Sequence, residues 1–88
     1  MERGVLAAER RLPHMGGEIR RLAFADPAFR ALCEDLAEAQ AAVERWGATA
    51  TAPAPSRRAE YEQLAAELAA EIAAAIIGHT VPHPAGER

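Results

Sequence analysis

Residues 26–46 read DPAFRALCEDLAEAQAAVERW and carry the signals of one amphipathic helix. The Asp26 carboxylate can accept hydrogen bonds from the free N–H groups of a first helical turn, and Pro27 falls at the first helical position, where its missing N–H costs nothing. Apolar residues then follow at spacings of three and four, so they share one face. They are Phe29, Leu32, Leu36, Ala39, Val43 and Trp46. We therefore predict a helix over residues 27–46, with Gly47 in the position of a left-handed C-terminal cap.

A second amphipathic helix is predicted over residues 57–77. Ser56 is a candidate N-cap, and Gly78 is expected to end the helix. The apolar face of this helix consists of Tyr61, Leu64, Leu68, Ile72 and Ile76. Alanines fill its flanks, which favours the helix and lets another helix approach closely.

Residues 47–56 read GATATAPAPS and have no apolar period, so we expect a linker there. The linker is long enough for the second helix to fold back along the first. The sequence therefore predicts an all-α fold built on an antiparallel two-helix hairpin within residues 18–77. We expect residues 78–88, which contain two prolines and no apolar period, to form a disordered tail.

The N-terminal quarter carries weaker signals. Residues 18–25 predict a short helical segment that folds across the end of the hairpin. The residues expected to meet there are Ile19 and Leu22 with either Phe24 or Phe29. Residues 1–17 predict a flexible or weakly helical arm, broken from the rest by Pro13 and a Gly-Gly pair.

The chain is too small and too rich in alanine to hide a large core. It has 88 residues, half of them hydrophobic, but 23 of them are alanine. Small domains bury a low fraction of their surface. We therefore expect a second chain to complete the fold, by homodimerisation into a four-helix bundle or by binding a helix of another protein.

The charge pattern bears on partners and location. The net charge is −3, with ten arginines and no lysine, which argues against general nucleic-acid binding. Binding of nucleic acid through the arginine-rich N-terminal arm is an alternative function. No apolar run approaches the length of a membrane span, and no signal peptide is visible, so we expect no membrane partner and a cytoplasmic location.

The residue pattern predicts no catalytic, cofactor or metal site. A di-metal helical bundle needs Glu-x-x-His motifs, and the predicted helices contain no histidine. The spaced pairs that could hold a cation are Glu34 with Glu38, Glu67 with Glu71, and His79 with His83. We interpret the acidic pairs as solvated faces, and the two histidines cannot share a helical face because Pro82 lies between them.

Several single residues have a structural interpretation. Cys33 is the one cysteine, lies beside the apolar stripe and is expected to be a small buried hydrophobic residue. Arg30 and Glu34 can pair on the solvent face of the first long helix. Trp46 and Tyr61 flank the linker and are expected to close the open end of the hairpin.

The order of these residues resembles a known family. The pattern begins with Ile19-x-x-Leu22 and Asp26-Pro27-x-Phe29-x-x-Leu32, continues with Glu34-Asp35, Glu38 and Val43-x-Arg45, and ends with Tyr61, Leu64, Leu68, Glu71-Ile72 and Ile76. It is similar to the YdcH-like family of small bacterial helical-hairpin proteins, over roughly residues 18–77. The second helix departs from that family because it is rich in alanine and glutamate. The resemblance implies the hairpin fold and no activity.

The predicted function is a non-enzymatic protein–protein interaction module. Its interaction stripe combines both long helices and consists of Phe29, Leu32, Leu36, Val43, Trp46, Tyr61, Leu64, Leu68, Ile72 and Ile76. One alternative is a helical bundle that binds a small ligand or a metal. A small helical enzyme is a special case of this alternative. Such an enzyme would need arginines that converge in a closed pocket, and the candidates are Arg20, Arg30 and Arg45.

Overall fold

The computed structural model describes residues 2–47 and 54–80, which are helical almost throughout and contain no strand. The elements in chain order are α1 (Arg3–Arg11), the 3-10 turn η1 (Pro13–Met15), α2 (Gly16–Ala25), α3 (Pro27–Gly47) and α4 (Ala54–Thr80). The predicted all-α fold class is therefore confirmed. The remaining parts of the predicted linker and tail, residues 48–53 and 81–88, lie outside the described residues.

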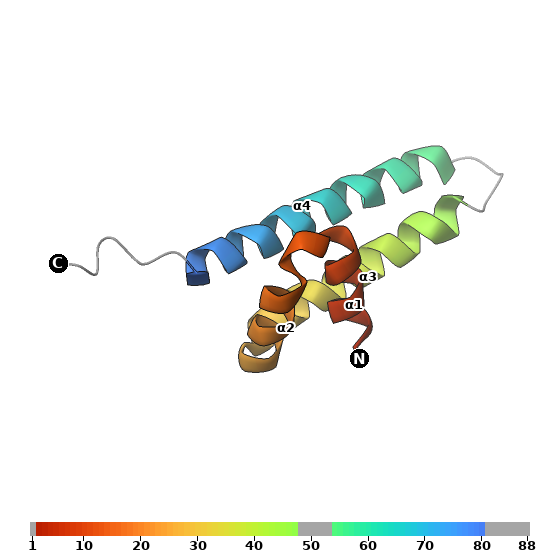
Figure 1. The fold of residues 1–88 in the computed structure, drawn as a ribbon. Helices are drawn as coiled ribbons and strands as arrows, with labels where there is room; N and C mark the ends of the chain where they lie inside the picture. Colours follow the sequence, from red (N-terminus) through yellow and green to blue (C-terminus); the bar gives the residue numbers. More distant parts are fainter. Residues whose placement is uncertain (1, 48–53, 81–88) are drawn as a thin grey trace.

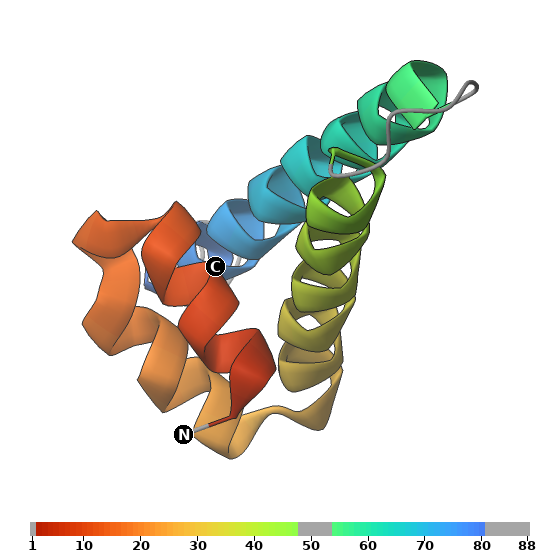
Figure 2. The ribbon, with the colours of Figure 1, turned by 90° about the vertical axis from the view of Figure 1, so that its right-hand side faces the viewer.

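The two long helices form an antiparallel pair on which the shorter helices pack. Figure 1 shows α3 and α4 running side by side in opposite directions, with α1 and α2 against one half of the pair. Seen from the side, α3 and α4 are close where the linker joins them and diverge away from it, and α1 and α2 occupy the widening space (Figure 2). The C-terminal end of α1 reaches Val43 and Glu44 of α3 and Glu62 of α4, so α1 covers one face of the pair and leaves the other face free of α1 and α2.

The core draws on all four α-helices. Its buried members are Val5 and Ala8 of α1, Ile19 and Ala23 of α2, Phe29, Cys33, Leu36 and Ala39 of α3, and Ala65, Leu68, Ile72 and Ile76 of α4. Ile19, Leu36 and Ile72 are fully buried. Burial of such side chains contributes about 2 kcal/mol each, so the buried residues of α1 and α2 stabilise the fold.

Asp26 ends one helix and begins the next. Its own N–H donates to the Leu22 carbonyl at 2.8 Å, and its carboxylate Oδ1 accepts from the N–H groups of Ala28 at 3.0 Å and Phe29 at 3.3 Å. The backbone of Asp26 is extended (φ −129°, ψ 104°), as expected for a residue before proline. The chain therefore turns sharply between α2 and α3.

The N-terminal arm, predicted as flexible or weakly helical, contains the helix α1, which packs against α3. The reason is Gly4, which is buried against the backbone of α3. A Cβ atom at this position would lie 2.6 Å from the Glu34 nitrogen and 2.8 Å from the Cys33 carbonyl carbon. The Gly4 N–H also donates to Glu34 Oε2 at 3.0 Å, so a carboxylate of α3 satisfies the N-terminus of α1.

The predicted ion pair between Arg30 and Glu34 is not the one that forms. The Arg30 Nε lies 3.9 Å from the Glu2 carboxylate, and its Nη1 donates to the Ala23 carbonyl at the end of α2 at 2.7 Å. Glu34 instead faces the start of α1, with Arg3 at 4.0 Å. The i, i+4 rule assumes a solvated face, whereas α1 and α2 cover this one.

The ends of the long helices differ from the predicted ones by a few residues. Gly47 is the last residue of α3, and α4 begins at Ala54, so Ser56 lies inside its first turn rather than at its N-cap. Proline is tolerated in that turn, so Pro55 is compatible with a helix that begins at Ala54. The helix also continues through Gly78 to Thr80, because one exposed glycine costs only about 1 kcal/mol.

Replacing Gly4 with alanine should separate α1 from α3. Because the added methyl group would meet backbone atoms, which cannot rotate away, we expect a loss of roughly 1–3 kcal/mol in the free energy of unfolding. Chemical denaturation followed by circular dichroism measures this change.

Gly17→Ala is the matched control. Its Cβ would meet only the mobile end of Arg21, at 3.6 Å, so the helix-forming preference of alanine should leave stability unchanged or slightly higher. Equal stabilities of the two variants would contradict the close crossing at Gly4.

Candidate interaction surface on the hairpin

The fold uses most of the predicted stripe internally. Phe29, Leu36, Leu68, Ile72 and Ile76 are buried. Leu32, Val43, Trp46 and Tyr61 are partly buried, and Leu64 is exposed at 41 %. These buried members belong to the same core cluster as the buried residues of α1 and α2. The apolar surface that the stripe leaves exposed is therefore smaller than the sequence predicts. Leu64 is its exposed member, whereas Phe24 and Ile77, exposed at 91 % and 51 %, lie outside the stripe.

One face of the α3–α4 pair carries a solvent-open groove of about 340 Å³. Its lining from α3 is Asp35, Glu38, Ala39, Ala42 and Arg45, and its lining from α4 is Tyr61, Leu64 and Leu68. We call it the open-face groove. The buried alanines of α3 give it a small-residue floor, whereas Leu64 forms an exposed apolar wall. An apolar floor with charged ends is suited to receive another helix.

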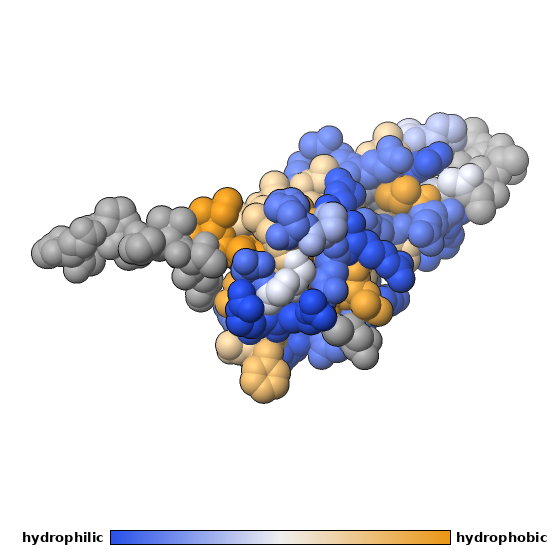
Figure 3. Space-filling view, viewed as in Figure 1, coloured by the Kyte–Doolittle hydropathy of each residue, from blue (hydrophilic) through white to orange (hydrophobic). Residues whose placement is uncertain are grey.

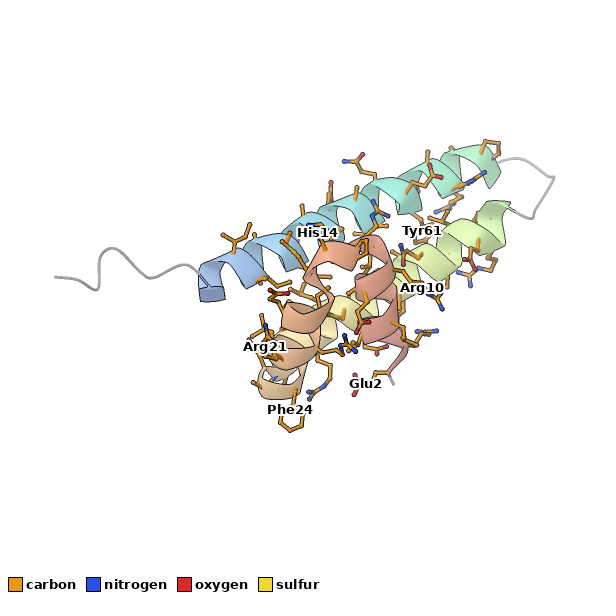
Figure 4. The ribbon with its side chains drawn as sticks, viewed as in Figure 1. Glu2, Arg10, His14, Arg21, Phe24 and Tyr61 are labelled. Atoms are coloured by element: carbon orange, nitrogen blue, oxygen red, sulfur yellow. The ribbon has the colours of Figure 1, made fainter. Side chains whose placement is uncertain are left out.

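A second groove lies where α1 meets the hairpin, and it is more polar. It measures about 530 Å³ and is lined by Arg10 and Arg11 of α1, Gln40, Val43 and Glu44 of α3, and Glu62 and Ala65 of α4. Arg10, labelled in Figure 4, is exposed in the last turn of α1. Charged residues dominate the face that carries α1 and α2, with apolar patches between them (Figure 3). This groove has few apolar side chains that a partner could bury.

A third hollow, of about 280 Å³, contains two of the arginines named above. Arg20 and Arg30 both line it, together with Glu2, Val5, Ala23 and Phe24. The two guanidinium groups are engaged, however, since Arg20 lies 3.3 Å from Glu9 and Arg30 lies 3.9 Å from Glu2. The hollow is also open to solvent. It therefore does not form the closed cationic pocket that an enzyme for an anionic substrate requires.

Phe24 points away from the protein. It is 91 % exposed and projects from the end of α2, as Figure 4 shows. The sequence predicted that either Phe24 or Phe29 would meet Ile19 and Leu22, and Phe29 is the buried one, at 2 % exposure. In α2 the inward positions are those of Ile19 and Ala23, four residues apart, and Phe24 is out of phase with them.

Cys33 is a buried thiol beneath the crossing of α1 and α3, as the sequence predicted. Burial, followed by the negative charges of Glu34 and Glu2, raises the pKa of this thiol from 9.0 to about 11. A cysteine with so little thiolate at neutral pH is a poor nucleophile. Its position and chemistry fit a small core residue.

The cation-binding pairs do not gain further ligands. Within residues 2–47 and 54–80, no three His, Cys, Asp or Glu side chains gather closely enough to hold a metal ion. Glu34 is used by α1, as described above, and the side chains of His79 and His83 lie outside the described residues. His14 is exposed in η1.

No protein-family model, curated protein or solved structure matches this chain significantly. Among the helices that the structure describes, none combines the length and the apolar character needed to cross a bilayer. The geometry of the surface is therefore the basis for assigning a function.

Sequence reasoning missed two features of this surface. The first is that α1 covers part of the stripe. It was missed because glycine has a low helix propensity, so Gly4 argues locally against a stable helix. The second is the pair of charged ends of the open-face groove, Glu38 and Arg45. The available signal was their spacing of seven residues, two helical turns along the edge of the stripe.

The buried thiol predicts how stability depends on pH. Because the folded state holds the Cys33 proton up to about pH 11, whereas the unfolded state releases it near pH 9, stability should fall as pH rises between these values. The loss is at most about 1.4 kcal/mol per pH unit. Urea unfolding at several pH values between 8 and 10.5 measures it.

Cys33→Ala is the control, because it removes the titrating group with little change in volume. Its stability should decline less steeply over the same range. Identical pH dependence in the two proteins would contradict a raised thiol pKa.

Proposed function

We propose that the chain is a non-enzymatic helical interaction module that self-associates through the open-face groove, so that two hairpins form a four-helix bundle. The observation that carries the proposal is the exposed side chain of Leu64 beside a floor of buried alanines, in a groove that no residue of α1 or α2 lines. An exposed leucine beside half-buried Tyr61 is an apolar surface that a partner can remove from water.

The shape of the groove favours a helix as its occupant. Tyr61, Leu64 and Leu68 are spaced by three and four residues, the spacing at which side chains of one helix insert between those of another. Ala39 and Ala42 have short side chains, so the two helix axes can come close. A second hairpin would supply two helices and complete a four-helix arrangement.

The groove is less suited to a small ligand. Ligand sites enclose most of the surface of their ligand, and this groove is open to solvent along its side. The sequence suggests a cytoplasmic location for such a module. It also suggests that the module is a bacterial hairpin protein of the YdcH-like kind.

Leu64→Glu tests the proposal. A carboxylate at this position would have to be buried without a partner, so the dimer should dissociate while the fold of the monomer is kept. Size-exclusion chromatography with light scattering should give twice the chain mass of 9.4 kDa for the native protein and the chain mass for the variant.

Ala70→Glu is the matched control, since Ala70 is exposed on the same helix and does not line the groove. It should remain a dimer. A native protein that is monomeric at high micromolar concentration, or a Leu64→Glu variant that dimerises normally, would overturn self-association through this groove.

A further inference from the structure

We propose that the open-face groove binds the same groove of a second copy about a two-fold axis that sets α3 antiparallel to α3, with Glu38 of each copy facing Arg45 of the other. This inference rests on the proposed self-association and adds its orientation and register. It is drawn from the order of charged and apolar residues along the groove.

The charged residues of α3 that line the groove are sorted by sign. Asp35 and Glu38 lie at one end of the groove and Arg45 at the other. Glu38 and Arg45 are seven residues apart, or about 10 Å along the helix axis. An antiparallel two-fold arrangement brings the acidic end of each copy to the basic end of the other, whereas a parallel one brings like charges together. Electrostatic complementarity therefore selects the antiparallel orientation.

The acidic end of the groove is available for contacts between chains. Asp35 and Glu38 are both exposed, and neither takes part in an ion pair within the described part of the chain. The neighbouring Glu34, by contrast, is held by α1. The two acids thus face outward on the side that α1 does not reach.

The apolar residues of α4 are arranged in a matching way. Because α4 runs antiparallel to α3, Leu68 lies toward the acidic end, Leu64 in the middle and Tyr61 toward Arg45 (Figure 1). A two-fold axis through the middle places Leu64 against Leu64 of the second copy and Tyr61 against its Leu68. The exposed leucine therefore lies at the axis, where a surface must be complementary to itself.

A charge-swap experiment tests this register by sedimentation equilibrium. Glu38→Arg alone and Arg45→Glu alone should each weaken the homodimer at least about tenfold, because each creates two like-charge contacts. The double variant restores opposite charges and should regain near-native affinity. An equimolar mixture of the two single variants should form a heterodimer more stable than either homodimer, since all its contacts are then Arg–Glu.

Glu44→Arg is the control, because Glu44 is exposed on the same helix but lines the other groove. It should leave the affinity unchanged, and circular dichroism should show native helicity for every variant. A native dimer whose single variants bind normally, or whose double variant is weaker than either single one, would overturn the register and leave self-association standing. A native protein that is monomeric throughout would overturn the register and the proposed function together.

Discussion

The structure depends on the close approach of α1 to α3 at Gly4. Because this residue has no side chain, the backbones meet, and Glu34 can accept the Gly4 N–H. The crossing covers Cys33 and helps to bury the N-terminal half of the α3 stripe. The sequence predicted that a second chain would cover the apolar stripe, and the chain covers this part of the stripe with its own N-terminal helix. The stripe is thereby divided into an internal part and a part that remains at the surface.

That division explains why an apolar surface remains and where it lies. The α1 and α2 helices occupy the space where α3 and α4 diverge (Figure 2), and they line only one face of the α3–α4 pair at the level of Leu64. Leu64 stays exposed on the other face, beside Ala39 and Ala42. In the proposed dimer, a second copy covers this face of the hairpin, which α1 and α2 leave uncovered.

The parts of the structure that could be predicted from sequence are those set by local chemistry. The all-α class follows from the apolar period, the Asp26 cap from the Asp-Pro pair, and the burial of Cys33 from its place beside the stripe. The packing of the N-terminal helix could not be predicted. Gly4 stabilises it only through contact with Glu34, which lies 30 positions away in the sequence. The partners of Arg30 were missed for the same reason, since spacing within one helix says nothing about a helix that packs over it.

The most direct test of this account is an isotope-filtered NOE experiment on a mixture of ¹³C-labelled and unlabelled chains, which detects only contacts between copies. In the proposed dimer, Leu64 methyl groups contact Leu64 of the other copy and Tyr61 contacts its Leu68, while Val5 and Ile19, within the core, show contacts inside one chain only. Leu64 methyl groups without any contact to a second copy, under conditions where the protein is dimeric, would contradict it.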